Sequence, residues 1–372
     1  MSTYRPLTAV VLAAGEGTRM RSARPKPLHV LVGRPMLLHV LDALSELPVE
    51  RAVVVVGHGA ERVTKTLQEQ APPHLILDFV EQHVPRGTGD AASVALTAFP
   101  DDLDADDGDI VVLPGDTPLL RPTTLAALVR EHRDHDAACT ILTAHLDHPG
   151  GHERVVHDKD ERVSRIVEHA LATEEERQID EVNTSIYCFR RSLLAPALRR
   201  LSPENTAGEY YLSDVVAVLH DAGYKVVSMV ADDPAETVGV NDRAQLAVAE
   251  AVLRERINDR WMRRGVTMLD PDRTYVDASV RLAADVTLFP STMLHGDTVV
   301  GAGARLGPDV RLTDCAVGEG AIVEQAVGQH SAVGEGAIVG PFASLPPGSH
   351  VPAGLRTGAF YTASGGDDDD SG

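Results

Sequence analysis

Two basic side chains, Arg19 and Lys26, follow a glycine-rich turn near the start of the chain. Residues 10–28 read VVLAAGEGTRMRSARPKPL, and the apolar beginning of this stretch predicts a buried parallel strand. Gly15 and Gly17 permit close backbone approaches, so the turn can aim backbone N–H groups at a phosphate. The stretch therefore predicts a phosphate-binding loop, although it fits neither GxGxxG nor GxxxxGK. The alternative is an ordinary strand and turn with solvated basic residues.

A candidate metal ligand, Asp116, lies in the sequence VVLPGDTPLL. Its carboxylate is expected just beyond a strand end, where ligands bind in open α/β sheets. One carboxylate with phosphate oxygens is the usual way in which Mg²⁺ is held, although an aspartate after a strand is also a common turn former. Asn241 precedes a helix that we expect to reach about residue 258. It is a candidate for capping that helix or for binding the same ion.

Apolar runs alternate with amphipathic stretches from residue 8 to about residue 230. Strands are predicted at 8–13, 51–56, 75–80, 109–113, 137–144 and 226–230. Helices are predicted at 35–46, 60–70, 90–98 and 123–133. This alternation predicts an α/β, Rossmann-like domain with a mostly parallel sheet. An acidic run at 101–109 is expected to be a solvated loop rather than a metal site.

A six-residue repeat of aliphatic residues follows residue 276. Its members are Val300, Leu306 and Leu312, and then Val327, Val333, Val339, Leu345 and Val351, with a slip near 313–323. This period with turn glycines predicts a short left-handed parallel β-helix, in which each side of a coil contributes one inward aliphatic. Hairpins would show a period of two instead. Residues 276–356 suffice for about four coils of roughly eighteen residues.

The formal net charge of −21 argues against nucleic acid or an anionic membrane as the main partner. It does not argue against a nucleotide, because a local site of Arg, Lys and Mg²⁺ can override the global field. The three cysteines are far apart and indicate no disulfide framework. The first apolar run is too short for a signal peptide or a membrane span, so a cytoplasmic protein is expected.

These motifs together resemble the bacterial bifunctional N-acetylglucosamine-1-phosphate uridyltransferases/glucosamine-1-phosphate acetyltransferases, the GlmU family. The resemblance runs from residue 8 to about residue 360. The matching motifs are LAAGEGTRM with Lys26, GTG at 87–89, GDTPLL at 115–120, EVN at 181–183, EYYLSDVV at 209–216 and GVNDRAQLA at 239–247. It implies in-line attack of a sugar 1-phosphate on the α-phosphate of a nucleoside triphosphate, which releases pyrophosphate.

The resemblance also implies roles for individual residues. Arg19 and Lys26 would be catalytic, and Asp116 and Asn241 would bind Mg²⁺. The nucleotide would contact Leu12, Ala13, Ala14, Gly15, Gly17, Thr18, Gln82, Gly87 and Thr88, with Gln82 reading the base. The sugar would lie against Glu153, Glu168 and Asn183.

The chain departs from the family's pattern at three places. The family's GYGR is Gly-His-Glu-Arg at 151–154, so Glu153 replaces the glycine that approaches the sugar. The family's LGTGHA is RGTGDA at 86–91, and its glycine after EVN-T/A is Ser185. These changes favour a pathway-specific enzyme for another hexose or cyclitol 1-phosphate, with GTP or ATP as candidate donors. The alternatives are a uridyltransferase for N-acetylglucosamine 1-phosphate without the second activity, and a non-catalytic nucleotide-sensing subunit.

In that family the β-helix continues further and carries the acetyl-CoA site and its catalytic histidine. Those coils are absent from this sequence, so we expect no acetyltransferase activity. Association of three copies through the β-helix is also implied. We expect a nucleotidyltransferase domain at 1–250, a linker helix at 251–265, the β-helix at 266–360 and a disordered acidic tail at 361–372.

Overall fold

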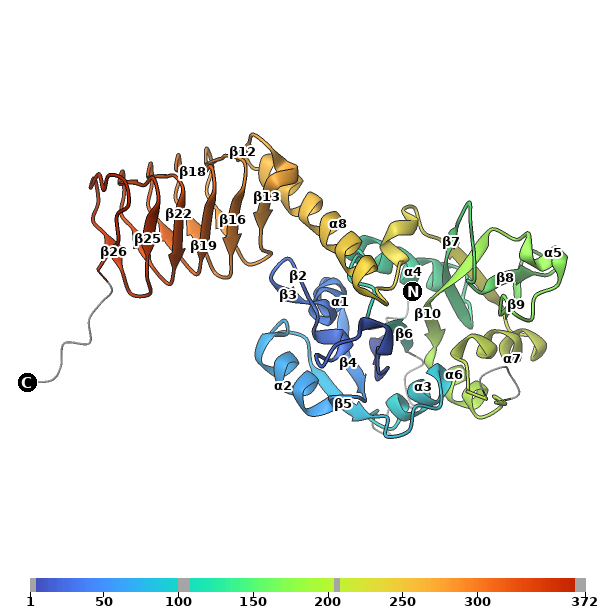
Figure 1. Ribbon diagram of the computed structural model, residues 1–372. Helices are drawn as coiled ribbons and strands as arrows, with labels where there is room; N and C mark the ends of the chain where they lie inside the picture. Colours follow the sequence, from blue (N-terminus) through green and yellow to red (C-terminus); the bar gives the residue numbers. More distant parts are fainter. Residues whose placement is uncertain (1–4, 100–107, 204–207, 365–372) are drawn as a thin grey trace, which may run out of the picture. The chain divides into compact units, whose positions relative to one another are not determined.

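The structure is a computed structural model that describes residues 5–99, 108–203 and 208–364 (Figure 1). It divides into two compact units: Met1–His29 with Pro35–Leu246, and Val30–Arg34 with Ala247–Gly372. Most of the acidic run at 101–109 and the end of the predicted tail lie outside the described residues.

The first unit is built on a nine-stranded sheet. Its main path runs β11 (Val226–Val230), β7 (Cys139–His145), β10 (Glu181–Arg190), β6 (Asp109–Pro114), β1 (Leu7–Ala13), β4 (Val49–Val56) and β5 (Leu77–Glu81). The six predicted strands are all present, and β1 pairs in parallel with both β4 and β6. The sequence analysis missed β10, which runs antiparallel to β6 and β7, and the hairpin of β8 (Arg154–His157) and β9 (Val163–Val167).

Helices cover both faces of this sheet. The unit contains α1 (Met36–Ser45), α2 (Ala60–Gln70), α3 (Thr88–Leu96), α4 (Pro122–Asp134), α5 (Glu174–Arg177), α6 (Arg191–Leu198) and α7 (Val215–Asp221). It also holds the 3₁₀ turns η1 (Thr18–Met20), η2 (Lys26–Leu28), η4 (Leu212–Asp214) and η5 (Pro234–Thr237). The four predicted helices correspond to α1 to α4.

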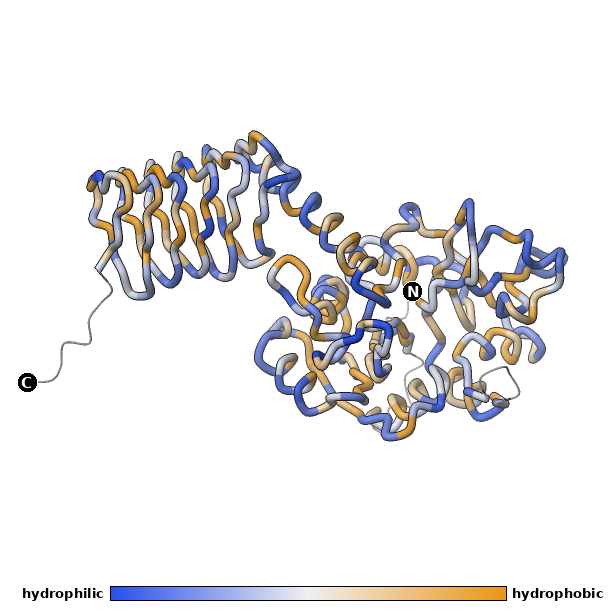
Figure 2. Tube along the Cα trace, viewed as in Figure 1, coloured by the Kyte–Doolittle hydropathy of each residue, from blue (hydrophilic) through white to orange (hydrophobic). Residues whose placement is uncertain are grey.

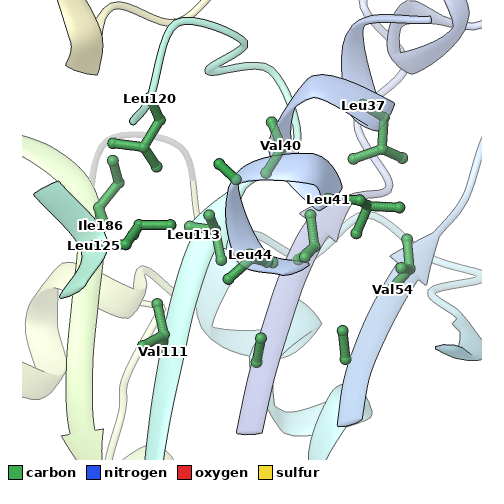
Figure 3. Close-up of a cluster of buried hydrophobic side chains, with 14 of the residues drawn as sticks. Leu37, Val40, Leu41, Leu44, Val54, Val111, Leu113, Leu120, Leu125 and Ile186 are labelled. Atoms are coloured by element: carbon green, nitrogen blue, oxygen red, sulfur yellow. The ribbon is translucent and has the colours of Figure 1, made fainter. Parts of the chain in front are cut away.

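Each strand in the centre of the sheet buries side chains on both faces. On β1, Val11 packs in the cluster formed with α1, α2 and α4, and Figure 3 shows α1 leucines over β4 and β6 in that cluster. The neighbouring Val10 packs in the opposite cluster, with α3, α6 and α7. Because successive strand residues alternate between faces, burial on both sides explains why β1 is a continuous apolar run.

The second unit is a parallel β-helix preceded by α8 (Arg243–Met262), whose last part covers most of the predicted linker. Its sheets are β12 (Thr267–Met268), β15 (Thr287–Leu288), β18 (Arg305–Leu306), β21 (Ile322–Val323) and β24 (Ile338–Val339); β13 (Thr274–Val276), β16 (Thr292–His295), β19 (Val310–Thr313), β22 (Ala326–Gln329) and β25 (Ala343–Leu345); and β14 (Arg281–Leu282), β17 (Val299–Val300), β20 (Ala316–Val317), β23 (Ala332–Val333) and β26 (His350–Val351). Short elements β2 (Val30–Leu31), β3 (Arg34–Pro35) and η6 (Pro271–Arg273) complete the list.

The β-helix corrects two details of the sequence prediction. Each sheet has five strands, so there are five coils rather than four, because the first coil already begins at Thr267. Val327 is 47% exposed instead of pointing inward. It pairs with Arg311 and shares its outward side, while the small residues Ala326 and Gly328 point inward. The other members of the repeat are buried, and Figure 2 shows apolar residues recurring along the coils.

Candidate active site

A cavity of about 980 Å³ opens in the first unit and includes the end of β1. It is lined by fourteen of the sixteen predicted site residues: Leu12, Ala13, Ala14, Gly15, Arg19, Lys26, Gln82, Gly87, Thr88, Asp116, Glu153, Glu168, Asn183 and Asn241. Gly17 and Thr18 lie in the same loop but outside the lining. The topology explains this meeting, because the ends of parallel strands share one edge of the sheet.

The glycine loop after β1 holds Lys26 in place. Gly17 has φ +64, the left-handed region that favours glycine, and starts the 3₁₀ turn η1. A Cβ on Gly17 would lie 2.6 Å from Lys26 Cβ. The lysine stem therefore packs directly over the position where other residues would carry a side chain. By contrast, a Cβ on Gly15 would meet nothing within 4 Å, so the cavity is open at that point of the loop.

Lys26, Asp116, Asn241 and Arg19 form one polar cluster. Lys26 Nζ donates to Asp116 Oδ2 and, at 2.9 Å, to Asn241 Oδ1. Arg19 Nη2 donates to the same amide oxygen at 3.0 Å. Because Asp116 Oδ2 and Asn241 Oδ1 both reach one lysine nitrogen, these two oxygens converge on one point of the cavity.

The capping role that the sequence left open for Asn241 belongs to its neighbour. Asp242 Oδ1 accepts a hydrogen bond from the Gln245 backbone N–H at 2.8 Å, in the first turn of α8. Gln245 Oε1 in turn accepts from the Asn241 backbone N–H at 2.7 Å. The Asn241 side chain therefore points at Lys26, while the hydrogen bonds of Asp242 and Gln245 hold the neighbouring backbone.

The donor set fits a divalent cation of the hard, oxygen-binding kind. A carboxylate and an amide oxygen converge, and Mg²⁺ is usually held by one or two such protein ligands together with substrate phosphates. Among the described residues, no group of three or more His, Cys, Asp or Glu side chains could hold a metal ion by itself. The protein can thus supply two ligands, and the phosphates of a nucleotide would have to supply others.

At another part of the cavity, the amide of Gln82 is fixed by two acceptors. Gln82 is buried, and its Nε2 donates to Asp90 Oδ2 at 2.7 Å and to the Gly87 carbonyl at 3.1 Å. Thr88 Oγ1 accepts from the Leu212 backbone N–H at 3.0 Å. Asp90, one of the departures from the family pattern, therefore sets the orientation of the residue expected to read the base.

The Glu153 carboxylate lies at the part of the cavity expected to hold the sugar. Glu153 Oε2 accepts from Asn183 Nδ2 at 2.6 Å, and Ser213 Oγ donates to Oε1 at 3.2 Å. The second N–H of the Asn183 amide donates to the Tyr187 phenol oxygen at 2.8 Å. Asn183 Oδ1 accepts from the Ser185 backbone N–H at 3.1 Å. The polar atoms of Asn183 are thus all engaged by protein groups.

Burial raises the pKa of Glu153, and the negative charges of Glu168 and Asp214 raise it further. The hydrogen bonds from Asn183 and Ser213 lower this pKa without cancelling the increase.

Ser185 has φ +62, so the backbone at this departure keeps the left-handed conformation that glycine adopts most easily.

Sequence reasoning missed Tyr187 and Ser213 as members of this network. Tyr187 lies in a strand, where it belongs to the buried core, and nothing local marks its phenol as a partner of Asn183. Ser213 lies inside the EYYLSDVV motif, directly before an acidic residue. This pairing of a hydroxyl with a carboxylate is a sequence signal that could have identified Ser213.

Residues 9–222 match the family of MobA-like NTP transferase domains. A protein named bifunctional protein GlmU, from Desulfitobacterium hafniense (strain DSM 10664 / DCB-2), is 44% identical over 352 residues, which are 95% of this chain and 75% of that relative. The protein of the same name from Thermobifida fusca (strain YX) is 46% identical over 331 residues, 89% of this chain and 68% of the relative. This chain belongs to the GlmU family.

GlmU-family membership confirms the resemblance, the fold class and the enzyme class expected from the motifs. The chain is a sugar-1-phosphate nucleotidyltransferase. A solved structure of HddC from Yersinia pseudotuberculosis complexed with GMP-PN aligns with 66% of this chain and 99% of its own, at 18% identity and a TM-score of 0.49. No helix in the described part of this GlmU-family chain is long and apolar enough to cross a membrane.

Proposed function

We propose that this enzyme acts on a sugar or cyclitol 1-phosphate other than N-acetylglucosamine 1-phosphate. The observation that carries this proposal is the hydrogen bond of Glu153 to Asn183 inside the cavity. With its N–H groups given to Glu153 and Tyr187, the Asn183 amide has no donor left for an acetyl carbonyl of a sugar. An ionised carboxylate only accepts hydrogen bonds, so Glu153 would itself repel that carbonyl oxygen.

The cluster at the loop suits the reaction of the family. The attacking phosphate is already ionised and needs no base, so the protein contributes position and charge. Arg19 and Lys26 would bind phosphate oxygens and stabilise the charge that develops on the pyrophosphate leaving group. Asp116 and Asn241 would hold Mg²⁺, which when bound neutralises phosphate charge and helps to orient the reacting oxygens.

The donor nucleotide is the less constrained part of the proposal. Because Asp90 accepts a hydrogen bond from one N–H group of the Gln82 amide, GTP and ATP are candidate nucleotide substrates in addition to UTP. A second function, UTP-dependent uridylyl transfer to N-acetylglucosamine 1-phosphate, is favoured by the 44% identity to a protein named bifunctional protein GlmU. In that case Glu153 would have to turn away from Asn183 when the sugar binds.

The test is pyrophosphate release in the presence of Mg²⁺, with four nucleoside triphosphates crossed against a panel of sugar and cyclitol 1-phosphates. We expect another pair to exceed UTP with N-acetylglucosamine 1-phosphate in kcat/KM. A clear preference for that pair would establish the second function instead. Omission of Mg²⁺, with a chelator present, should abolish release for every pair.

We also propose that three copies associate through the β-helix, as the family resemblance implies, and that the enzyme works in the cytoplasm, where nucleoside triphosphates are available. Light scattering of the purified chain tests the first statement, and cell fractionation tests the second.

A further inference from the structure

Three carboxylates interact through their charges at or beside the sugar part of the cavity. Glu153 and Glu168 both line it, and Asp214 follows Ser213, whose hydroxyl bonds Glu153. Burial raises the pKa of Asp214, and the charge of Glu168 raises it further, as it does for Glu153. Two of these negative charges therefore lie on the cavity wall, and the third lies next to Ser213.

The adjacent cation, Arg154, is directed elsewhere. Its Nη1 donates to the His152 carbonyl, and its Nη2 donates to the Gly150 carbonyl at 3.0 Å. Arg154 begins β8 and is buried, whereas Glu153 lies just before the strand at the cavity wall. Successive side chains of an extended chain point to opposite sides. The guanidinium therefore braces the backbone of the turn at 150–152 rather than covering the Glu153 carboxylate.

A neutral acetamido group offers this site a single N–H donor and no charge, and its carbonyl oxygen is an acceptor like the carboxylates. A protonated amine offers three donors and a positive charge, and it would relieve the repulsion among the carboxylates. We infer that this cavity selects a sugar 1-phosphate that carries a free, protonated amine, and that Glu153 is the residue that recognises it. This inference rests on the proposed function, since it concerns the acceptor of the same reaction.

The decisive comparison uses glucosamine 1-phosphate and N-acetylglucosamine 1-phosphate, which differ only in the acetyl group, with glucose 1-phosphate as a neutral third acceptor. We expect the wild-type enzyme to show its highest kcat/KM with glucosamine 1-phosphate. Glu153→Gln keeps the size of the side chain and removes its charge. It should lower the preference for the amine over the acetamide by about 10- to 100-fold, the value of a hydrogen bond to a charged group.

Glu161→Gln is the matched control, because it removes the same charge from an exposed position in the turn between β8 and β9. It should leave the preference unchanged. A wild-type preference for the acetamide or for glucose 1-phosphate would overturn the inference, and so would an unchanged ratio in Glu153→Gln. A preference for glucose 1-phosphate, or an unchanged ratio in Glu153→Gln, would leave the proposed function standing. A preference for the acetamide, or no turnover of any sugar or cyclitol 1-phosphate, would overturn the proposed function as well, so the two failures are distinguishable.

Discussion

Replacement of Gly17 by alanine tests whether Gly17 positions Lys26 for catalysis, because its effect on turnover can be separated from its effect on folding stability. Gly17 lies at φ +64, and the new Cβ would lie 2.6 Å from Lys26 Cβ and 3.2 Å from its Cγ and Cδ. Carbon atoms in contact are normally about 3.5–4.0 Å apart, so the lysine stem must move by on the order of 1 Å. Its ammonium group would then leave the position where it meets Asp116 and Asn241.

Two costs are expected, and they differ in kind. An alanine in the left-handed region costs roughly 1–2 kcal/mol of folding free energy. For a domain of this size, that lowers the melting temperature by about 2–8 °C. A misplacement of about 1 Å in a group that positions the reactants can cost about 100-fold in rate. Gly17→Ala should therefore lose about two orders of magnitude in kcat while remaining folded at assay temperature.

Gly223→Ala is the matched control. Gly223 has φ +83, and a Cβ built there meets nothing within 4 Å, so this variant has the backbone cost without any clash. Gly17→Ala should lose at least as much melting temperature as Gly223→Ala, measured by calorimetry, while only Gly17→Ala should lose turnover, measured as pyrophosphate release. If the two variants retained equal kcat, Lys26 would not be positioned by contact with Gly17, and this reasoning would be refuted.

Three further predictions concern single side chains. Lys26→Ala should lower kcat by roughly 100- to 1,000-fold, the usual loss when one charge-stabilising donor is removed; Lys65→Ala, on an exposed part of α2, should leave kcat unchanged, and equal turnover in the two variants would remove Lys26 from the mechanism. Asp116→Ala should lower turnover by orders of magnitude and raise the Mg²⁺ concentration needed for half-maximal rate; an unaltered Mg²⁺ dependence would argue against Asp116 as a ligand. The hydrogen bond to Asp277 raises the pKa of His295 above 6.5, so this pair stabilises the β-helix fully below that value and less as the pH rises through the raised pKa. The melting temperature of the wild type should thus fall more steeply toward alkaline pH than that of His295→Gln, and parallel pH profiles would contradict it.

The fold was largely predictable because its signals are local. Strand β1 is a run of apolar residues buried on both faces, and the β-helix repeats an inward aliphatic in each side of a coil. The six-residue rule failed at Val327, because this side of the coil places the small residues Ala326 and Gly328 inward instead. The hairpin of β8 and β9 was missed because both strands are short and mix polar with apolar residues.

The candidate site was predictable as a list of positions but not as a network. Gly17 and Lys26 are nine positions apart, and their contact depends on how the loop returns over itself. Glu153 meets Asn183 and Ser213, which lie 30 and 60 positions away, because β8 pairs with β10 and η4 approaches the same cavity. Such contacts depend on the tertiary structure and cannot be predicted from the spacing of residues in the sequence.

The central claim is that Glu153 excludes N-acetylglucosamine 1-phosphate from this site. The most direct measurement is kcat/KM for that compound with the preferred nucleotide, in the wild type and in Glu153→Gly. Removing the carboxylate frees one N–H group of the Asn183 amide. The variant should therefore use N-acetylglucosamine 1-phosphate with a kcat/KM at least about 10-fold higher than that of the wild type, which corresponds to the free energy of about one hydrogen bond. A wild type that already uses it best, and a variant that only loses activity, would contradict the claim.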